Sequence, residues 1–491
     1  MKTPHQSLNQ AASADAPAPA SAAGTAGPAG AAPGDSGRPS RRSLLVGAGA
    51  TALSGATALS AATTASAGAT SAVSVAPADV VVPSPDQLPL TGGPEFPVGL
   101  FWPPHPYAST KERFAEIKGA GFDFVISGNY AGDGNIFKYQ LGLARDTGLQ
   151  LLISDDIQIR NMSRWFSISD TPTDFLSITP AEARALYTRA RDAYGPYSSL
   201  AGFNFYDEPG AGWFTTLAKA LAISRELAPQ LLPYVNLLPS DDPAYYRNFI
   251  DTVKPSLISF DRYPLLSAGR EDANYFHNWA IVRDAALRGD VPAWVFIQTL
   301  AYNNHREPTA AELRWQINVS LAYGAKGIQY FTYWTPEPAR GEGFGPALIT
   351  VEGRRTSRYY AAQQINNGWL HPVGRELKPL VSESVVHANE TLLPNGAVGF
   401  TPTDLVPGIS GSPVVVGTFR SRDAASGDRW LLVANRSHSA PAKAVVAVDQ
   451  QKVGSVGVFQ AGRKKYVPQR VGPVRVSLAP GAATLIKLGV K

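Results

Sequence analysis

Between Phe96 and Trp369 the sequence alternates short apolar runs of four to seven residues with amphipathic stretches of 12–18 residues. This alternation is typical of βα units arranged around a parallel sheet. Eight of these runs are expected to be strands: Pro97–Trp102, Phe122–Ser127, Gln150–Asp155, Gly202–Tyr206, Leu232–Asn236, Leu257–Asp261, Ala293–Gln298 and Ile328–Tyr333. Eight βα units in roughly 275 residues match the usual size of a closed (β/α)8 barrel.

Local signals agree with this interpretation. Thr179–Glu182 and Thr309–Glu312 each combine an N-cap hydroxyl with a glutamate three residues later, which indicates a helix start. Gly148 stands where a helix would end before the next strand. The alternative, a doubly wound open sheet, lacks support because Pro103-Pro104 replaces the glycine-rich phosphate loop after the first strand.

The region after Lys378 has no helical period. Its β-rich runs are separated by Gly, Pro, Asn or Asp, and they are Val414–Phe419, Trp430–Asn435, Lys443–Val448, Val453–Phe459 and Val474–Leu478. This pattern of short β-rich runs predicts a small antiparallel β-sandwich. The predicted fold class is therefore α/β, with a (β/α)8 TIM barrel over residues 96–376 and a β-sandwich over residues 377–491.

The N-terminus has the features of an export signal. Residues 1–40 are almost all Ala, Pro, Gly, Ser and Thr, and Arg41-Arg42 precedes a weakly apolar run that ends in Ala65-Ser66-Ala67. This order resembles a twin-arginine signal over residues 1–67, cleaved after Ala67, with residues 68–95 as a linker. A transmembrane anchor is disfavoured, because Ser, Thr and Gly interrupt the run. We expect a secreted protein that meets the twin-arginine export machinery and the membrane only during export.

Composition excludes several classes of protein. The chain has no cysteine, so it has no disulfide, no thiolate nucleophile and no Cys-ligated metal. Its seven histidines show no metal-ligand spacing, and no G-x-S-x-G elbow is present, so we expect no metal, no other cofactor and no serine hydrolase. A formal charge of +5 over 491 residues, without a basic stripe, argues against a nucleic-acid partner.

The charge is unevenly divided. Residues 377–491 carry 14 Lys and Arg against 6 Asp and Glu, whereas residues 68–376 carry 26 against 31. The basic surplus thus belongs to the predicted sandwich, which could contact an anionic cell-wall polymer by charge and be released by raised salt.

If the barrel is correct, chemistry lies at the C-terminal ends of its strands. Carboxylates, amides and aromatic rings collect there, a mixture that suits sugars because rings stack on sugar faces while polar groups bridge hydroxyls. The predicted substrate-binding residues are Trp102, Asn129, Tyr130, Asp155, Asp156, Tyr206, Asn236, Arg262, Tyr263, Gln298, Tyr330, Tyr333 and Trp334. For Asp155 and Asp156 a helix N-cap is the alternative role, and for the aromatic residues it is packing.

Two carboxylates are the minimum for glycosidic hydrolysis. Glu208 is the predicted general acid, since it ends the fourth strand beside Asp207, whose like charge raises one of the two pKa values. Asp261 is the preferred second carboxylate, with orienting Arg262 or capping a turn as its alternative role.

Three segments resemble the clan A glycoside hydrolases, the β-galactosidase-like and agarase-like (β/α)8 enzymes. Gly202–Pro209 resembles their strand-4 acid/base motif, Ser259–Pro264 their strand-6 D-x-Y-P motif, and Ala347–Tyr359 their loop into the last helix. The resemblance covers residues 96–370 and implies a glycosidase in which a glutamate ends strand 7 as nucleophile. Here Gln298 stands at that place, and a neutral amide cannot form a glycosyl ester.

Several arrangements therefore remain open. The enzyme inverts, with Glu208 as acid and Asp261 or another Asp as base; or it is substrate-assisted, with Asp207 and Glu208 acting as a pair on an acetamido sugar; or Glu337 or Glu342 enters from the loop after strand 8. The expected function is a secreted glycoside hydrolase acting on a poly- or oligosaccharide. The alternative is a secreted carbohydrate-binding or cell-wall-binding protein on a degenerate, non-catalytic barrel.

Overall fold

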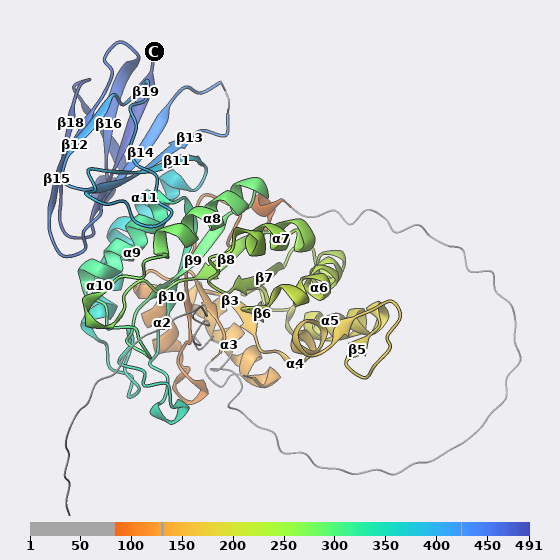
Figure 1. Ribbon diagram of the computed structural model, residues 1–491. Coiled ribbons are helices and arrows are strands. Elements are labelled where there is room, and N and C mark those ends of the chain that lie inside the picture. The colour runs from red at the N-terminus through yellow and green to blue at the C-terminus, as the bar shows by residue number, and fades with distance from the viewer. Residues whose placement is uncertain (1–83, 129–131, 424) are drawn as a thin grey trace, which may run out of the picture. The chain divides into compact units, whose positions relative to one another are not determined.

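A computed structural model describes residues 84–128, 132–423 and 425–491. The predicted signal over 1–67 and most of the linker lie outside these residues. Within them the chain forms a closed parallel barrel with strand order β1-β10-β9-β8-β7-β6-β3-β2, followed by two antiparallel sheets (Figure 1). The predicted TIM barrel followed by a sandwich is therefore confirmed.

The barrel strands lie close to their predicted positions. They are β1 (Val98–Phe101), β2 (Phe124–Ile126), β3 (Gln150–Ser154), β6 (Leu200–Asp207), β7 (Leu232–Leu237), β8 (Ile258–Asp261), β9 (Ala293–Gln298) and β10 (Ala325–Phe331). β9 has the predicted bounds, whereas β6 and β10 begin two and three residues earlier than expected. A two-stranded excursion, β4 (Ser167–Ile168) with β5 (Ser177–Ile178), lies between β3 and β6.

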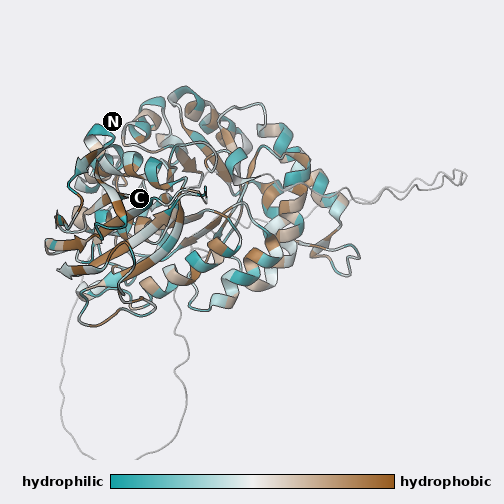
Figure 2. Cartoon of the chain, turned by 90° about the horizontal axis from the view of Figure 1, so that it is seen from above, coloured by the Kyte–Doolittle hydropathy of each residue, from teal (hydrophilic) through white to brown (hydrophobic). Residues whose placement is uncertain are grey.

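Helices follow the barrel strands and surround them. They are α2 (Lys111–Gly119), α3 (Gly134–Thr147), α4 (Ile157–Arg160), α5 (Pro180–Tyr194), α6 (Phe214–Leu227), α7 (Pro243–Val253), α8 (Tyr275–Arg288), α9 (Ala310–Ala322), α10 (Ser357–Ile365) and α11 (His371–Leu377). Both predicted capping boxes are present, Thr179 with Glu182 on α5 and Thr309 with Glu312 on α9. Gly148 caps α3 with a left-handed φ of 70°. Each helix carries hydrophilic as well as hydrophobic residues, as a layer with one wetted face requires (Figure 2).

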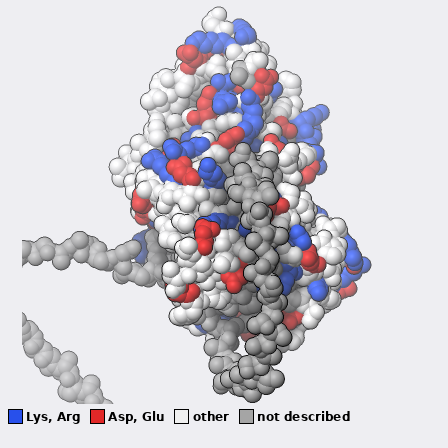
Figure 3. Space-filling view, turned by 90° about the vertical axis from the view of Figure 1, so that its right-hand side faces the viewer, with Lys and Arg blue, Asp and Glu red and all other residues white. Residues whose placement is uncertain are grey.

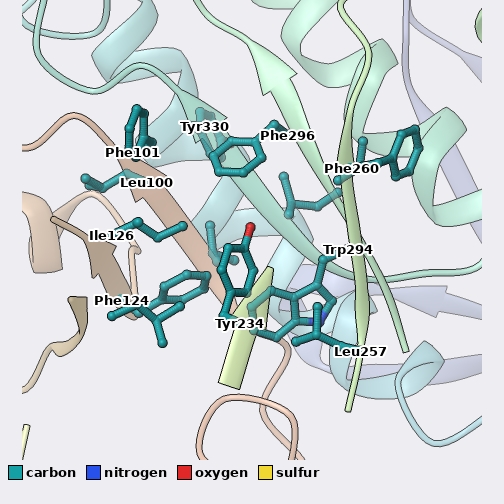
Figure 4. Packing of buried hydrophobic residues seen from close by; sticks show 14 of the residues in the cluster. Leu100, Phe101, Phe124, Ile126, Tyr234, Leu257, Phe260, Trp294, Phe296 and Tyr330 are labelled. Atoms are coloured by element: carbon teal, nitrogen blue, oxygen red, sulfur yellow. The ribbon is translucent and has the colours of Figure 1, made fainter. Parts of the chain in front are cut away.

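Large aromatic side chains fill the barrel interior around Trp294 on β9. Phe124 and Tyr234 both pack on the Trp294 ring, with ring centroids 5.4 and 6.2 Å away, and Figure 4 shows the three gathered together. Glycines make room for them: a Cβ at Gly99 would lie 2.1 Å from the Phe124 ring, and one at Gly327 would lie 2.7 Å from the Trp294 ring. The interior is thus a packed core and not a channel.

The sandwich has a six-stranded sheet and a three-stranded sheet. The first has the order β11-β13-β14-β19-β16-β17 and the second β12-β15-β18. Their strands are β11 (Val381–Ala388), β12 (Gly408–Gly411), β13 (Val414–Arg420), β14 (Arg429–Asn435), β15 (Ala442–Ala447), β16 (Val453–Gln460), β17 (Lys465–Gln469), β18 (Val474–Leu478) and β19 (Ala483–Val490). Of these, β11, β12, β17 and β19 were not among the predicted strands.

The central strands of the larger sheet are buried on both faces. On β14, Leu431 and Val433 pack in the core between the two sheets, whereas Leu432 and Ala434 belong to the same hydrophobic cluster as the barrel. Because successive side chains of a strand point to opposite faces, one face meets the smaller sheet and the other meets the barrel. This explains the continuous apolar run at this strand.

Ionic groups add to that apolar contact. His438 of the sandwich lies 3.1 Å from Glu271 before α8 and 3.2 Å from Glu312 on α9, and Arg436 lies 3.1 Å from Glu271. Burial opposes ionisation of Glu271, but its hydrogen bond from His438 and the charge of Arg436 outweigh burial and lower its pKa. The acidic barrel and the basic sandwich thus meet through groups of opposite charge.

We expect this contact to make the free energy of unfolding depend on pH in the acidic range. A carboxylate whose folded pKa lies below its ordinary value of 4.5 stabilises the fold above that pH, and the stabilisation is lost as the pH falls through the folded pKa. Denaturant unfolding between about pH 3 and pH 7 should therefore show a smaller acid-induced loss in Glu271→Gln than in the wild type. Identical pH profiles would contradict this role of Glu271.

Candidate active site

Three residues at the C-terminal ends of barrel strands have left-handed backbone conformations. Trp102 follows β1 with φ 64°, Asp155 follows β3 with φ 69°, and Glu208 follows β6 with φ 58°. A non-glycine residue in this region costs about 1 kcal/mol or more, and such residues concentrate at functional sites. Their gathering at one end of the barrel selects that end as the candidate site.

A bulge in β6 sets the direction of the Asp207-Glu208 pair. The register between β6 and β7 slips between Asn204 and Tyr206, so the Phe205 carbonyl leaves the ladder. It accepts hydrogen bonds from Ser163 Oγ at 2.6 Å and Arg164 Nε at 2.9 Å. A bulge re-aims the side chains that follow it, and here those are the predicted catalytic carboxylates.

Arg164 also links this bulge to the end of β3. Its Nη1 donates to Asp155 Oδ1 at 2.7 Å, and both side chains are about one-tenth exposed. Its Nη2 donates to the Asn204 carbonyl at 3.1 Å. Asp155 therefore serves as the carboxylate that orients Arg164, and Arg164 was not among the predicted site residues.

Asn236, at the end of β7, holds two of the predicted carboxylates together. Its Nδ2 donates to Asp207 Oδ1 at 3.2 Å and to Asp261 Oδ1 at 2.7 Å. Because both oxygens bond one nitrogen, they lie within about 6 Å of each other. All three side chains are buried, with 6% exposure for Asp207, 3% for Asp261 and 1% for Asn236.

A chain of hydrogen bonds orients Asn236 from inside the barrel. Ser259 Oγ donates to Asn236 Oδ1 at 2.9 Å and lies 2.8 Å from the Tyr234 hydroxyl. The Tyr234 hydroxyl in turn donates to Gln329 Oε1 at 2.9 Å, and Gln329 Nε2 donates back to Ser259 Oγ at 2.9 Å. With its oxygen used as an acceptor, the Asn236 amide must present its NH2 group to the two carboxylates.

Glu208 directly follows Asp207 in the chain, and its side chain is 7% exposed. Its backbone N–H donates to the Asn236 carbonyl at 2.8 Å. Tyr245, in the first turn of α7, donates to the Pro209 carbonyl at 2.6 Å. Burial raises the pKa of Tyr245, and the charges of Glu208 and Asp261 raise it further, so this hydroxyl lies within electrostatic range of both. Tyr245 was missed from the sequence because it lies on a helix, outside the strand ends.

Two predicted binding residues are committed to the protein itself. Arg262 is 2% exposed; its Nε and Nη2 donate to Asp272 at 2.6 and 3.1 Å, and its Nη1 donates to Asp241 at 2.6 Å. Asp156 caps α4, accepting from the Gln158 and Ile159 N–H groups and from the Tyr194 hydroxyl. These contacts show Asp156 in its alternative role as a helix N-cap and Arg262 paired with two carboxylates; substrate binding by either residue stays a prediction.

Gln298 is also structural. It is fully buried; its Nε2 donates to the carbonyls of Arg306 at 2.6 Å and Leu265 at 3.2 Å, while its Oε1 accepts from the Leu265 N–H at 3.1 Å. The amide is needed here because one side chain must donate and accept at once. Gln298 thus joins the loops after β8 and β9 through these hydrogen bonds, and its predicted role in substrate binding stays a prediction.

The predicted aromatic residues divide into two groups. Tyr330 and Tyr333 are fully buried against Phe122, and the Tyr330 hydroxyl donates to Asn366 Oδ1 at 2.6 Å. Since Asn366 directly follows α10, Tyr330 faces the helix layer. Both tyrosines thus have the packing role that the sequence analysis gave as the alternative to substrate binding.

The other aromatic residues lie at the strand ends. Tyr206 packs on Trp213, Tyr263 stacks on Phe331 at 5.3 Å, and the Arg340 guanidinium lies 4.6 Å from the Trp102 ring centroid. Trp334, 2% exposed, lies next to His105 and Arg113. Asn129 and Tyr130 lie outside the described residues.

Tyr302 and His305 extend the aromatic group around Tyr263. Their rings stack with centroids 4.8 Å apart, and both lie edge-on to Tyr263. They come from the loop after β9, which the prediction left out. The spacing of Tyr302 and His305, three residues apart in a loop after a barrel strand, was the available signal.

In the part of the chain that the structure describes, no three His, Asp or Glu side chains gather as metal ligands would. Nor does any described helix have the length and apolar character needed to span a bilayer.

Comparisons with known proteins add the following. No family model and no curated protein matches the chain. A solved β-L-arabinopyranosidase of glycoside hydrolase family 27 from Geobacillus stearothermophilus aligns at 12% identity and TM-score 0.47, covering 81% of this chain and 97% of its own.

Two further solved structures align similarly. A family 30 subfamily 8 xylanase from Clostridium acetobutylicum has 14% identity and TM-score 0.42, covering 80% of this chain and 96% of its own. An α-L-arabinofuranosidase from Thermotoga maritima has 11% identity and TM-score 0.40, covering 82% and 94%. Likenesses of this size say nothing of the substrate of this chain.

We expect Gln298→Glu to destabilise the protein without creating a nucleophile. The carboxylate would face two carbonyl oxygens with no donor to offer, which costs about 3 kcal/mol of unfolding free energy. Urea denaturation measures this loss, with the exposed Gln451→Glu as the matched control. Unchanged stability would contradict the structural role of Gln298.

Proposed function

We propose that this chain is an exported glycoside hydrolase in which Glu208 is the general acid and Asp261 the second catalytic carboxylate. The observation that carries the proposal is the Asn236 amide, which binds Asp207 and Asp261 next to Glu208. A set of carboxylates held together at the C-terminal end of a barrel, with aromatic rings around it, fits the chemistry of glycosidic cleavage.

In this mechanism Glu208 protonates the leaving glycosidic oxygen. Asp261, held by Asn236, takes a proton from the attacking water, and the products have inverted configuration. Supporting this choice, the end of β9 offers no nucleophile, since Gln298 is bonded to the backbone of two loops.

Asp207 supports a second mechanism at the same site. Its Oδ1 is oriented by Asn236, and a carboxylate so placed next to the acid can hold the acetamido group of a substrate that attacks its own anomeric carbon. This route gives retention and needs an acetamido sugar. Proton NMR of the first-formed anomer, with and without a 2-acetamido group on the substrate, distinguishes the two mechanisms.

We expect Glu208→Gln to lower kcat by about 10²–10⁴, the range for removing a general acid. An aryl glycoside with a good leaving group should lose less, because it needs little protonation. The matched control is Glu352→Gln, an exposed carboxylate in the loop before α10 whose change should leave kcat unaltered.

Three other results would count against the assignment. Equal loss with good and poor leaving groups would contradict the acid role of Glu208. Loss of activity in Glu342→Gln instead would transfer that role, since burial raises the pKa of Glu342 on the loop after β10. Glycan binding by a wild type that hydrolyses no glycan would favour the non-catalytic alternative.

Export is the further part of the proposal, and Arg41-Arg42 with Ala65-Ser66-Ala67 supports it. Replacing both arginines by lysine should retain the protein inside the cell, and the mature N-terminus found outside should be Gly68. An unprocessed chain in the medium would contradict the predicted cleavage. The basic surplus of residues 377–491 supports contact with an anionic wall polymer, but basic and acidic side chains are interspersed on the face shown in Figure 3.

A further inference from the structure

A cavity lies at the opposite end of the barrel from Glu208. It has a volume of about 310 Å³ and is lined at the N-terminal ends of β9 and β10, by Ala293, Trp294 and Lys326 among others. Its wall is completed by the end of α8, the described segment before β1, the link from α11 to β11, and Arg422. Because barrel chemistry occurs at the other end, this cavity is separate from the proposed active site.

The cavity is rich in cations. Five basic side chains line it, against two acidic ones, Asp86 and Asp290; the basic residues are Arg283, Lys326, Arg375, Lys378 and Arg422. Asp290 is 3.1 Å from Arg422, and Arg375 is paired at 2.9 Å with Glu95 outside the lining. Within the described part of the chain, Arg283, Lys326 and Lys378 have no carboxylate within salt-bridge distance.

These three cations are held in place by neutral oxygens. Lys326 Nζ donates to the carbonyls of Leu377 at 2.5 Å and Leu380 at 2.6 Å. Arg283 donates to Ser382 through Nε at 2.8 Å and Nη2 at 3.0 Å, and Lys378 Nζ donates to the Glu95 carbonyl at 2.6 Å. Each hydrogen bond fixes the direction of a cation, but none neutralises its charge.

The enclosed position of these three cations lowers their pKa values. Burial, together with repulsion from Arg422 and Lys378, lowers the pKa of Lys326 to about 7. Burial lowers the pKa of Lys378 to about 8, although Asp86, Glu95 and Asp123 oppose it, and burial also lowers the pKa of Arg283. Burying a cation without a counterion costs free energy, so an anion that enters the cavity is attracted by charges that no carboxylate neutralises.

We propose that this cavity is a binding site for phosphate or a phosphate monoester, with Lys326, Arg283 and Lys378 as its cationic donors. A doubly charged, tetrahedral anion can meet an ammonium group and a guanidinium group at once. The volume admits a phosphate with a small substituent.

The site predicts a linkage between binding and protonation. A bound anion stabilises the charged form of Lys326, so binding at pH values above about 7 takes up a proton. Affinity should fall as the pH rises from about 7 to 9, since the protonated form of Lys326 becomes less populated. Lys378, with a pKa of about 8, loses its proton over the same range and strengthens this trend, whereas the Arg283 guanidinium stays charged and Arg422 is paired with Asp290.

The test is calorimetric titration of the full chain with inorganic phosphate and with glycerol 3-phosphate at about pH 7.5, in two buffers of different ionisation enthalpy. We expect binding with proton uptake, and at least tenfold weaker binding by Lys326→Met. Lys443→Met, which changes an exposed lysine of β15, is the matched control and should bind as the wild type does. Tighter binding of the ester would assign a phosphorylated solute, and equal binding would assign the free anion.

Three results would overturn the proposal. The wild type binds neither anion at 10 mM; Lys326→Met binds as well as the wild type; or binding shows no proton uptake and no dependence on pH. If Lys326→Met does not fold, Arg283→Gln serves in its place, with the same expected loss, and the pH dependence of wild-type binding needs no variant.

Discussion

One hydrogen-bonded chain inside the barrel connects its packing to its candidate chemistry. It begins at Gln329 on β10, passes through Tyr234 and Ser259, and ends at Asn236, which binds Asp207 and Asp261. Beneath it, Tyr234 also packs on Trp294, so the tyrosine belongs to the apolar core and to the polar chain at once. The position of the carboxylates therefore depends on closure of the whole barrel, since its members come from β6, β7, β8 and β10.

The sandwich extends this organisation, because its larger sheet has a core on each face. Leu432 and Ala434 join the barrel cluster while Leu431 and Val433 fill the sandwich. Arg436 and His438 then pair with Glu271 and Glu312 of the barrel. Some of the basic side chains of the sandwich are thus paired with acidic side chains of the barrel. Fewer of them remain to contact other molecules.

Sequence patterns predicted the elements that depend on local physics. Both capping boxes formed, because a hydroxyl and a glutamate three residues apart satisfy helix N–H groups without help from the rest of the chain. The buried strand β9 has its predicted bounds. The edge strand β17 was missed because Lys465–Gln469 is polar and contains Pro468, which only an edge tolerates. β19 was also missed, although Leu485, Ile486 and Leu488 carried the signal.

The sequence by itself determined that polar and aromatic residues stand where eight parallel strands end, because the alternation of strands and helices places those ends on one rim. It could not determine which way each side chain faces. Gln298, Arg262 and Tyr330 lie at such ends, yet each is bonded to a loop or helix outside the barrel interior. Only the tertiary structure decided that Asp207 and Asp261 share the amide of Asn236. Their common donor comes from a third strand, and a bulge in β6 sets the direction of one of them.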